Sequence, residues 1–132
     1  MTDLPQSIRF NIAELNDELP GEGYHPAVIA TARLRMSQNN NPTLQVTYEL
    51  QDAASGCETV AEYFVLLGSS ARARAVSLRR LLALYRACGF EPHQGDPIRP
   101  EDLVSSRVEV RIGHETYDGM LRLRVLGYRA VS

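Results

Sequence analysis

The chain has 132 residues, of which 44% are hydrophobic and 23% are charged, and its formal net charge is −2. This composition is that of an ordinary globular domain, long enough to bury one core without disulfides or structural metals. No uncharged apolar run approaches the length that crosses a bilayer, and no segment resembles a signal peptide, so we expect a cytoplasmic protein without membrane association.

The basic residues are all arginine, 14 in number, and the chain has no lysine. A GC-rich genome would produce this bias without a functional cause, but arginine also suits contacts with phosphates and stacking on bases. The two cysteines, Cys57 and Cys88, belong to no CxxC motif and no cysteine–histidine cluster. We expect both to be isolated thiols with small buried side chains.

Charge is distributed unevenly along the chain. Residues 1–23 hold one arginine and five acidic residues, a net charge of −4, whereas residues 24–132 hold 13 arginines and 11 acidic residues, a net charge of +2. The first segment has no sustained apolar period and ends in a Pro-Gly turn signal. We therefore divide the chain into an acidic N-terminal arm (1–23) that packs through Phe10 and Ile12, and a folded domain (24–132).

Alternation with period two predicts three strands at the start of this domain. The first, 24–36, is partly apolar on both faces, which indicates that it is covered on both sides in places. The second, 43–50, has a clean half-buried alternation, and the third spans Glu58 to Leu67. Turn residues at 37–42 and around Gly56 separate them. On the first strand, one face is expected to carry Tyr24, Pro26, Val28, Ala30, Ala32, Leu34 and Met36.

Apolar residues at helical spacing predict one helix over about 70–88. Ser69 or Ser70 can accept hydrogen bonds from its first free amides, and Gly89 suits its end. The predicted buried stripe is Ala71, Ala75, Leu78, Leu82, Tyr85 and Cys88, widened by Leu81 and Leu84. The exposed side is expected to carry five arginines and no acid, namely Arg72, Arg74, Arg79, Arg80 and Arg86.

The remaining chain predicts two further strands. The segment 90–103 is rich in proline and glycine, which indicates a surface connection with a short helical turn near 100–103. A fourth strand is expected at 107–112, a loop at 113–119 with the sequence GHETYDG, and a fifth strand over the alternating residues 121–125.

The resulting order is β-β-β-α-β-β, mainly β with one helix. A five-stranded sheet with one amphipathic helix can hide its edges by closing into a small barrel that the helix plugs, so we predict an OB-fold. An open α+β sheet with the helix on one face fits the same order. The long, two-sided first strand favours the barrel.

Four segments resemble the small phage and prophage proteins of the DUF669 family. They are LPGEGYHPAVIATARL (19–34), LQVTYELQDAASGCETVAEYFVL (44–66), ARAVSLRRLLALYRACGF (73–90) and DLVSSRVEVRIG (102–113). The chain departs from the family pattern at Ser105, where the family usually has a glycine. The resemblance implies an OB-fold single-stranded DNA-binding protein of a phage replication or recombination module, with partners among the proteins of that module.

Signatures of catalysis are absent from the sequence, which contains no GxxxxGK, GxSxG or HExxH motif. The three histidines, His25, His93 and His114, are scattered over a strand start and two predicted loops. We therefore predict a non-catalytic protein with no metal and no cofactor.

Binding of nucleic acid without sequence preference needs positive charge along a groove and exposed aromatic rings. In an OB-fold this groove crosses strands 2 and 3 between the loops that join strands 1–2 and 4–5. The candidate residues are Arg33, Arg35, Arg122 and Arg124 as phosphate contacts, Tyr63 and Tyr117 as stacking platforms, and the outward-facing Gln45 and Thr47. The other tyrosines on strands, Tyr24, Tyr48 and Tyr128, are predicted to be core.

Two functions fit these residues. The first is sequence-independent binding of single-stranded DNA; the second is a protein-binding barrel, an adaptor or structural subunit that binds no nucleic acid. A basic groove with exposed tyrosines would favour DNA, and an apolar or acidic groove would favour a protein. The acidic arm can occupy the groove when DNA is absent, the helix arginines can bind a partner or the arm, and open strand edges can pair two copies.

Overall fold

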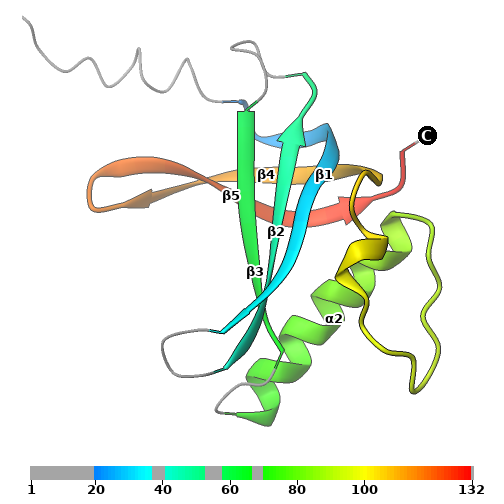
Figure 1. Ribbon diagram of the computed structural model, residues 1–132. Coiled ribbons are helices and arrows are strands. Elements are labelled where there is room, and N and C mark those ends of the chain that lie inside the picture. The colour runs from blue at the N-terminus through cyan, green and yellow to red at the C-terminus, as the bar shows by residue number, and fades with distance from the viewer. Residues whose placement is uncertain (1–19, 37–40, 53–57, 67–69, 132) are drawn as a thin grey trace, which may run out of the picture.

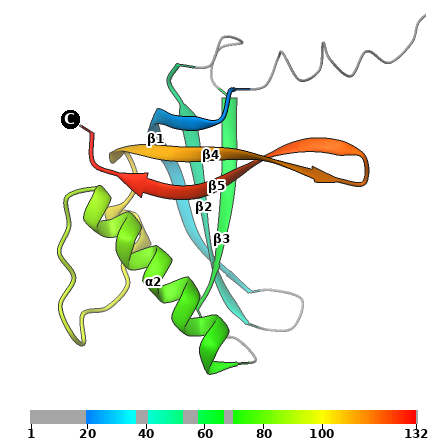
Figure 2. The same ribbon diagram turned by 180° about the vertical axis from the view of Figure 1, so that it is seen from behind.

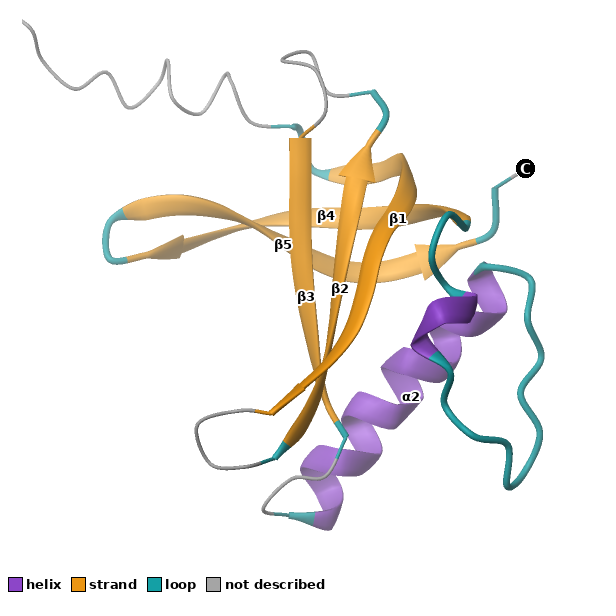
Figure 3. Cartoon of the chain, in the orientation of Figure 1, coloured by secondary structure: helices purple, strands orange, loops and turns teal. Residues whose placement is uncertain are grey.

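The computed structural model describes residues 20–36, 41–52, 58–66 and 70–131. In chain order these form β1 (Gly23–Met36), β2 (Pro42–Leu50), β3 (Glu58–Val65), α2 (Ala71–Ala87), the 3₁₀ turn η1 (Pro100–Asp102), β4 (Arg107–Tyr117) and β5 (Met120–Arg129). The predicted mainly-β class and β-β-β-α-β-β order are confirmed (Figures 1 and 3). Several predicted features lie outside the described residues. They are the arm before residue 20, the turns at 37–40 and 53–57, the second of which contains Cys57, and the positions Leu67 and Ser69.

All five strands form one antiparallel sheet in the order β3-β2-β1-β4-β5. The first half of β1 pairs with β4 and its second half with β2, so the sheet bends around β1. Figures 1 and 2 show the β4–β5 hairpin running across the β1–β3 strands, with α2 on one side of the sheet. The order ends at β3 and β5 without pairing them. The structure therefore shows a bent, unclosed five-stranded sheet.

A β-bulge in β1 exchanges its two faces. The pairing of β1 with β2 skips Ala30. Before the bulge, Ala27 and Ile29 are buried; after it, Ala32 and Leu34 pair with buried residues of β2 and share their face. The prediction of one uninterrupted alternation along this strand was wrong, because a single extra residue turns every following side chain to the other face.

The β4–β5 hairpin is longer than predicted. The segment 113–119 was expected to be a loop, but β4 continues to Tyr117 and β5 begins at Met120. Only Asp118 and Gly119 form the turn, with φ of 50° and 74°. Two residues at positive φ match the twist of an antiparallel pair, so an Asp-Gly dipeptide suffices to reverse the chain. The loop prediction was wrong, and its polar residues lie on a strand.

The helix has the predicted ends but a shifted buried face. The Ser70 hydroxyl accepts a hydrogen bond from the Ala73 amide at 3.1 Å, and Gly89 follows the helix at a φ of 96°. Leu78, predicted to be buried, is 38% exposed. The first half of α2 therefore projects away from the core, and the buried residues come from its second half, namely Leu81, Leu84 and Tyr85.

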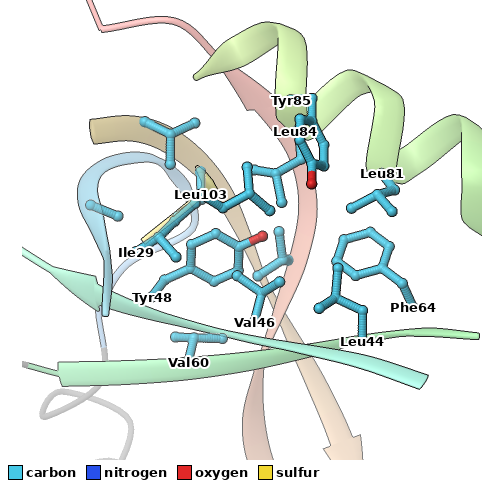
Figure 4. Packing of buried hydrophobic residues seen from close by; sticks show 14 of the residues in the cluster. Ile29, Leu44, Val46, Tyr48, Val60, Phe64, Leu81, Leu84, Tyr85 and Leu103 are labelled. Carbon is cyan, nitrogen blue, oxygen red and sulfur yellow. The ribbon is translucent and has the colours of Figure 1, made fainter. Parts of the chain in front are cut away.

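The core lies between this half of α2 and the inner face of the sheet (Figure 4). Alternate residues of β2 and β3 point into it, as predicted from their period. Leu103, just after η1, closes the core between β1 and the helix and is fully buried. The largest buried side chains that Figure 4 labels are Ile29, Leu44, Tyr48, Phe64, Leu84 and Leu103.

Candidate nucleic-acid interface

Three neighbouring strands bring five of the predicted site residues together. Arg33 of β1 pairs with Gln45 of β2, and Gln45 pairs with Tyr63 of β3, so these three form one row across the sheet. Arg35, two residues further along β1, donates a hydrogen bond from Nη1 to Oε1 of Gln45 at 2.6 Å. Thr47 lies in the next row on β2. Gln45, Thr47 and Tyr63 alternate with buried residues of β2 and β3, and the register sets Arg33 and Arg35 opposite Gln45 and Thr43, so all five lie on the outer face of the sheet.

This first group is open to solvent. Tyr63 is 57% exposed, which leaves its ring free for stacking. Arg33 and Arg35 are exposed, and neither forms an ion pair within the described ranges. An aromatic ring on β3 and two guanidinium groups on β1, which no described carboxylate neutralises, therefore stand on either side of β2.

The other three predicted residues lie on the β4–β5 hairpin. The Arg122 guanidinium lies over the ring of Tyr117, 4.2 Å from its centroid. Arg124 forms an ion pair with Glu115, with 3.5 Å between Nη1 and Oε2. The cross-strand register places Glu115 opposite Arg122, so these side chains share one face of the hairpin. Tyr117 is 57% exposed, and the hairpin thus presents a second group of cations and an aromatic ring.

A third aromatic residue was missed by the sequence analysis. Tyr24 was predicted to be core but is 39% exposed, and the Arg129 guanidinium lies 4.0 Å from its ring centroid. The Nε of Arg129 also donates to Oε2 of Glu109 at 2.9 Å, and this hydrogen bond raises the pKa of Arg129. The prediction for Tyr24 was wrong because the bulge puts the first half of β1 in the opposite phase.

Together, the strands present a strongly basic outer face. We define the outer face by the exposed or half-exposed charged and aromatic strand residues that the strand registers place on the side of the sheet opposite the core. The acidic members are three, Glu49, Glu109 and Glu115, and the aromatic members are Tyr24, Tyr63 and Tyr117. The basic members are seven, Arg33, Arg35, Arg107, Arg111, Arg122, Arg124 and Arg129. The net charge of −2 for the whole chain conceals this local excess.

The inner side of the sheet holds a buried carboxylate that the sequence analysis did not single out. Glu62 of β3 is 6% exposed. Its carboxylate accepts hydrogen bonds from the hydroxyls of Tyr48, at 2.8 Å, and Tyr128, at 2.6 and 2.5 Å, and it pairs with Arg80. The Arg80 guanidinium also lies 5.5 Å from the ring centroid of Phe64. Arg80 was predicted to belong to the exposed side of the helix; its side chain is 42% exposed, but its guanidinium pairs with this buried carboxylate.

These four residues, Glu62, Tyr48, Tyr128 and Arg80, are called the Glu62 cluster below. They come from β3, β2, β5 and α2, and they connect the two unpaired edge strands through side chains. Burial raises the pKa of Tyr128 to about 12 and that of Tyr48 well above its ordinary value, so both hydroxyls keep their protons and can donate. Tyr48 is buried as predicted, and Tyr128 packs against the core.

Two histidines attach the start of β1 to the sheet. Nε2 of His114 lies 2.7 Å from the carbonyl oxygen of Pro20, and Nε2 of His25 lies 2.5 Å from that of Gly21. Nδ1 of His25 lies 3.0 Å from both carboxylate oxygens of Asp52. Within the described ranges, no three side chains of the metal-ligating types come together. These histidines therefore have structural partners.

The reactivity of the Cys88 thiol, at the end of α2, tests whether this side chain is buried. Burial raises the pKa of its thiol from 9.0 to about 11. Because only the thiolate reacts, this shift lowers the reactive fraction at pH 8 about 100-fold. In a Cys57→Ser variant, alkylation by iodoacetamide at pH 8 is expected to be about 100-fold slower than for the same protein in urea. Equal rates in the folded and unfolded states would contradict the burial.

Comparison of the chain with protein-family models and with curated proteins finds no match in either. Over the part of the chain that the structure describes, no helix has the length and apolar character needed to cross a membrane. A proposal for function therefore rests on the geometry and charge of the outer face.

Proposed function

We propose that the protein binds single-stranded DNA on the outer face of its sheet, without sequence preference and without catalysis. The observation that carries this proposal is the excess of seven arginines over three glutamates on that face, interleaved with three exposed tyrosines. Arginine neutralises backbone phosphates whatever the sequence, and aromatic rings stack on any base. Both requirements of a sequence-independent interface are thus present on the same surface.

The row formed by Arg33, Gln45 and Tyr63 supports the proposal geometrically. Adjacent strands are about 4.8 Å apart, so a cation on β1 and a ring on β3 lie within about two strand spacings. This separation suits the phosphate and the base of neighbouring nucleotides. The Arg35–Gln45 hydrogen bond restrains both side chains on the free protein, which reduces the conformational entropy lost on binding.

We further propose that the sheet is a partly open OB-fold barrel. Its free edges, β3 and β5, are connected by the hydrogen bonds from Tyr128 to Glu62, and α2 covers the core beside them. OB-folds bind oligonucleotides on the face of strands 2 and 3 and the flanking loops, and these strands here carry Gln45, Thr47 and Tyr63.

One departure from the DUF669 pattern is compatible with this reading. Ser105 stands where that family usually has glycine, and its φ of 71° lies in the left-handed region that favours glycine. The serine therefore follows the backbone path that a glycine would take. We propose, from this resemblance, a role in phage or prophage DNA replication or recombination, in the cytoplasm and beside other proteins of that module.

The proposal is tested by fluorescence anisotropy with a labelled oligo-dT of about 30 nucleotides, at several salt concentrations up to about 0.15 M. The Arg33→Ala/Arg35→Ala variant is expected to bind about tenfold more weakly, and the slope of log K against log salt should fall by about 1.4, because two phosphate contacts are lost.

The matched control for this experiment is Arg72→Ala/Arg74→Ala. It removes the same charge from the exposed side of α2, and we expect an unchanged slope. If the natural chain binds no oligo-dT even at low salt, the DNA proposal is wrong. The protein-binding barrel, the second function that the sequence allows, would then take its place.

A further inference from the structure

The solvent side of α2 combines charge with apolar surface, and DNA binding on the outer face does not use it. Arg72, Arg74 and Arg79 are exposed, and none of the ion pairs among the described residues involves them. Val76 and Leu78, between them on the helix, are 48% and 38% exposed. A helix with several cations that have no ion pair among the described residues, and with exposed apolar side chains, has the composition of a docking surface.

Beside this surface lies a cavity of about 110 Å³. The segment 90–99 runs back alongside α2 in both views (Figures 1 and 2). Residues of the helix and of this segment line the cavity. Liquid water occupies about 30 Å³ per molecule, so the cavity has the volume of about four water molecules. One large apolar side chain has about the same size, so the cavity has room for it. Its main walls are Leu78, Leu82 and Tyr85 from the helix, and Pro92, Pro97 and Ile98 from the segment.

Hydrogen bonds and a contact between two aromatic rings hold these walls in place. The Tyr85 hydroxyl donates to the carbonyl oxygen of Arg99 at 2.9 Å, and the rings of Tyr85 and Phe90 meet edge to face at 5.9 Å between centroids. Asp96, the acidic residue in the lining, accepts a hydrogen bond from the His93 amide at 2.7 Å. The pocket is therefore preformed, and its one carboxylate is engaged within the turn.

The charge around the cavity indicates what it can bind. Arg74, Leu78, Leu82 and Arg86 follow one another at intervals of four residues, so they form a stripe with an arginine at each end. Arg86 is paired with Glu91, at 3.2 Å, whereas Arg74 has no such partner among the described residues. The fitting ligand is a segment with one bulky apolar side chain followed by carboxylates.

The N-terminal segment of the chain itself has this composition. Residues 1–19 carry the apolar Phe10 and Ile12, followed within eight residues by Glu14, Asp17 and Glu18. We propose that this segment docks on α2 of the same chain, with Phe10 in the cavity and its carboxylates against the helix arginines. The proposal is independent of DNA binding, which concerns the opposite surface of the sheet.

The length of the segment permits this contact. Its junction with the described domain is fixed at Pro20, whose carbonyl oxygen lies 2.7 Å from Nε2 of His114. Phe10 lies ten residues earlier, so an extended chain carries it up to about 35 Å from that point. A domain of this size has a radius of gyration of about 13 Å, and α2 is about 25 Å long, so the cavity is within reach.

The outer face competes for the same acidic segment, but the cavity beside α2 offers mainly apolar walls. Phe10 and Ile12 lose contact with water only where apolar walls cover them. On the outer face, two of the exposed rings already carry a guanidinium group, at Tyr24 and Tyr117. The hydrophobic effect therefore favours the helix side, while charge attraction alone would not decide between the two surfaces.

The absence of tryptophan from the chain makes the test direct. In the full-length Phe10→Trp variant, the indole emission is expected to be blue-shifted relative to the same chain in urea and several-fold less quenched by acrylamide. Leu78→Asp in this background should return the emission to the unfolded position. Val76→Asp, an equal charge change at an exposed apolar residue of the same helix but outside the cavity lining, should leave it blue-shifted.

A second measurement avoids the tryptophan substitution, because an indole could be too large for a cavity that accepts the Phe10 ring. Methyl NMR of the natural chain and of Phe10→Ser should show shifts of the Leu82 and Ile98 resonances. The proposal is overturned if both readouts are silent, if Leu78→Asp has no effect, or if the blue shift is lost on dilution. A shift of the emission with bound oligo-dT, rather than with Leu78→Asp, would place the segment on the outer face and also overturn it.

Discussion

Replacing Glu62 by alanine is expected to lower the free energy of unfolding by about 2–4 kcal/mol. The substitution leaves the buried Tyr48 hydroxyl without its acceptor and Arg80 without its counter-ion. Removing one partner of a buried ion pair costs about 3–5 kcal/mol, but the Arg80 side chain is 42% exposed, so water compensates part of its loss. Urea denaturation of the two proteins measures the difference.

Two variants separate the contributions within the Glu62 cluster. Glu62→Gln keeps an acceptor for the tyrosine hydroxyls and removes the charge, so we expect about half the loss of the alanine variant. Glu58→Ala, on the same strand but only half-buried, should change the free energy of unfolding by less than about 0.5 kcal/mol. Equal effects of Glu62→Ala and Glu58→Ala would show that the cluster does not connect β3 to β5 and α2.

The elements that the sequence predicts well are those whose signals are local. The alternation from Leu44 to Leu50 and the helical spacing from Leu81 to Tyr85 each arise from one element packing on one core, so periodicity alone identifies them. Ser70 and Gly89 mark the helix ends through the same short-range chemistry. These features need no knowledge of the neighbours in space.

Features that depend on one residue or on distant partners were missed. The bulge at Ala30 leaves no trace in β1, because both faces of that strand are partly apolar. The turn at Asp118 and Gly119 does have a signal, the Asp-Gly pair, but polar residues before it suggest a longer loop. The unclosed edges of the sheet depend on how far β3 and β5 approach, which no strand pattern encodes.

The candidate site divides in the same way. Alternation alone places Arg33, Gln45 and Tyr63 on outward positions, and the register then aligns them in one row. The partnership of Glu62 with Arg80 joins a strand to a helix 18 residues later. Two signals could have found it: an acid at an inward position of β3, and an arginine four residues before the buried Leu84.

Loss of both arginine groups of the outer face is expected to have the largest effect on binding. Replacement of Arg33, Arg35, Arg122 and Arg124 by alanine should weaken binding of the 30-nucleotide oligo-dT about 100-fold and lower the salt slope by about 2.8. Four phosphate contacts are removed, and Glu115 loses the cation that now pairs with it. Anisotropy titrations measure both quantities.

The length of the oligonucleotide distinguishes one continuous interface from two separate ones. β1 pairs with both β2 and β4, so the outer face runs without interruption from the first arginine group to the hairpin. On this geometry the losses from the two pairs multiply for the long oligonucleotide. An oligo-dT of about 8 nucleotides can occupy one group at a time, so either pair alone should cost only about twofold.

A matched quadruple variant separates local contacts from net charge. Arg72, Arg74, Arg79 and Arg86 lie on the exposed part of α2, and their replacement by alanine changes the net charge by the same amount. We expect its salt slope to stay that of the natural chain, because no phosphate contact is removed. Equal losses in the two quadruple variants would instead assign the affinity to the charge of the whole molecule, and the row of Arg33, Gln45 and Tyr63 would have no special part in it.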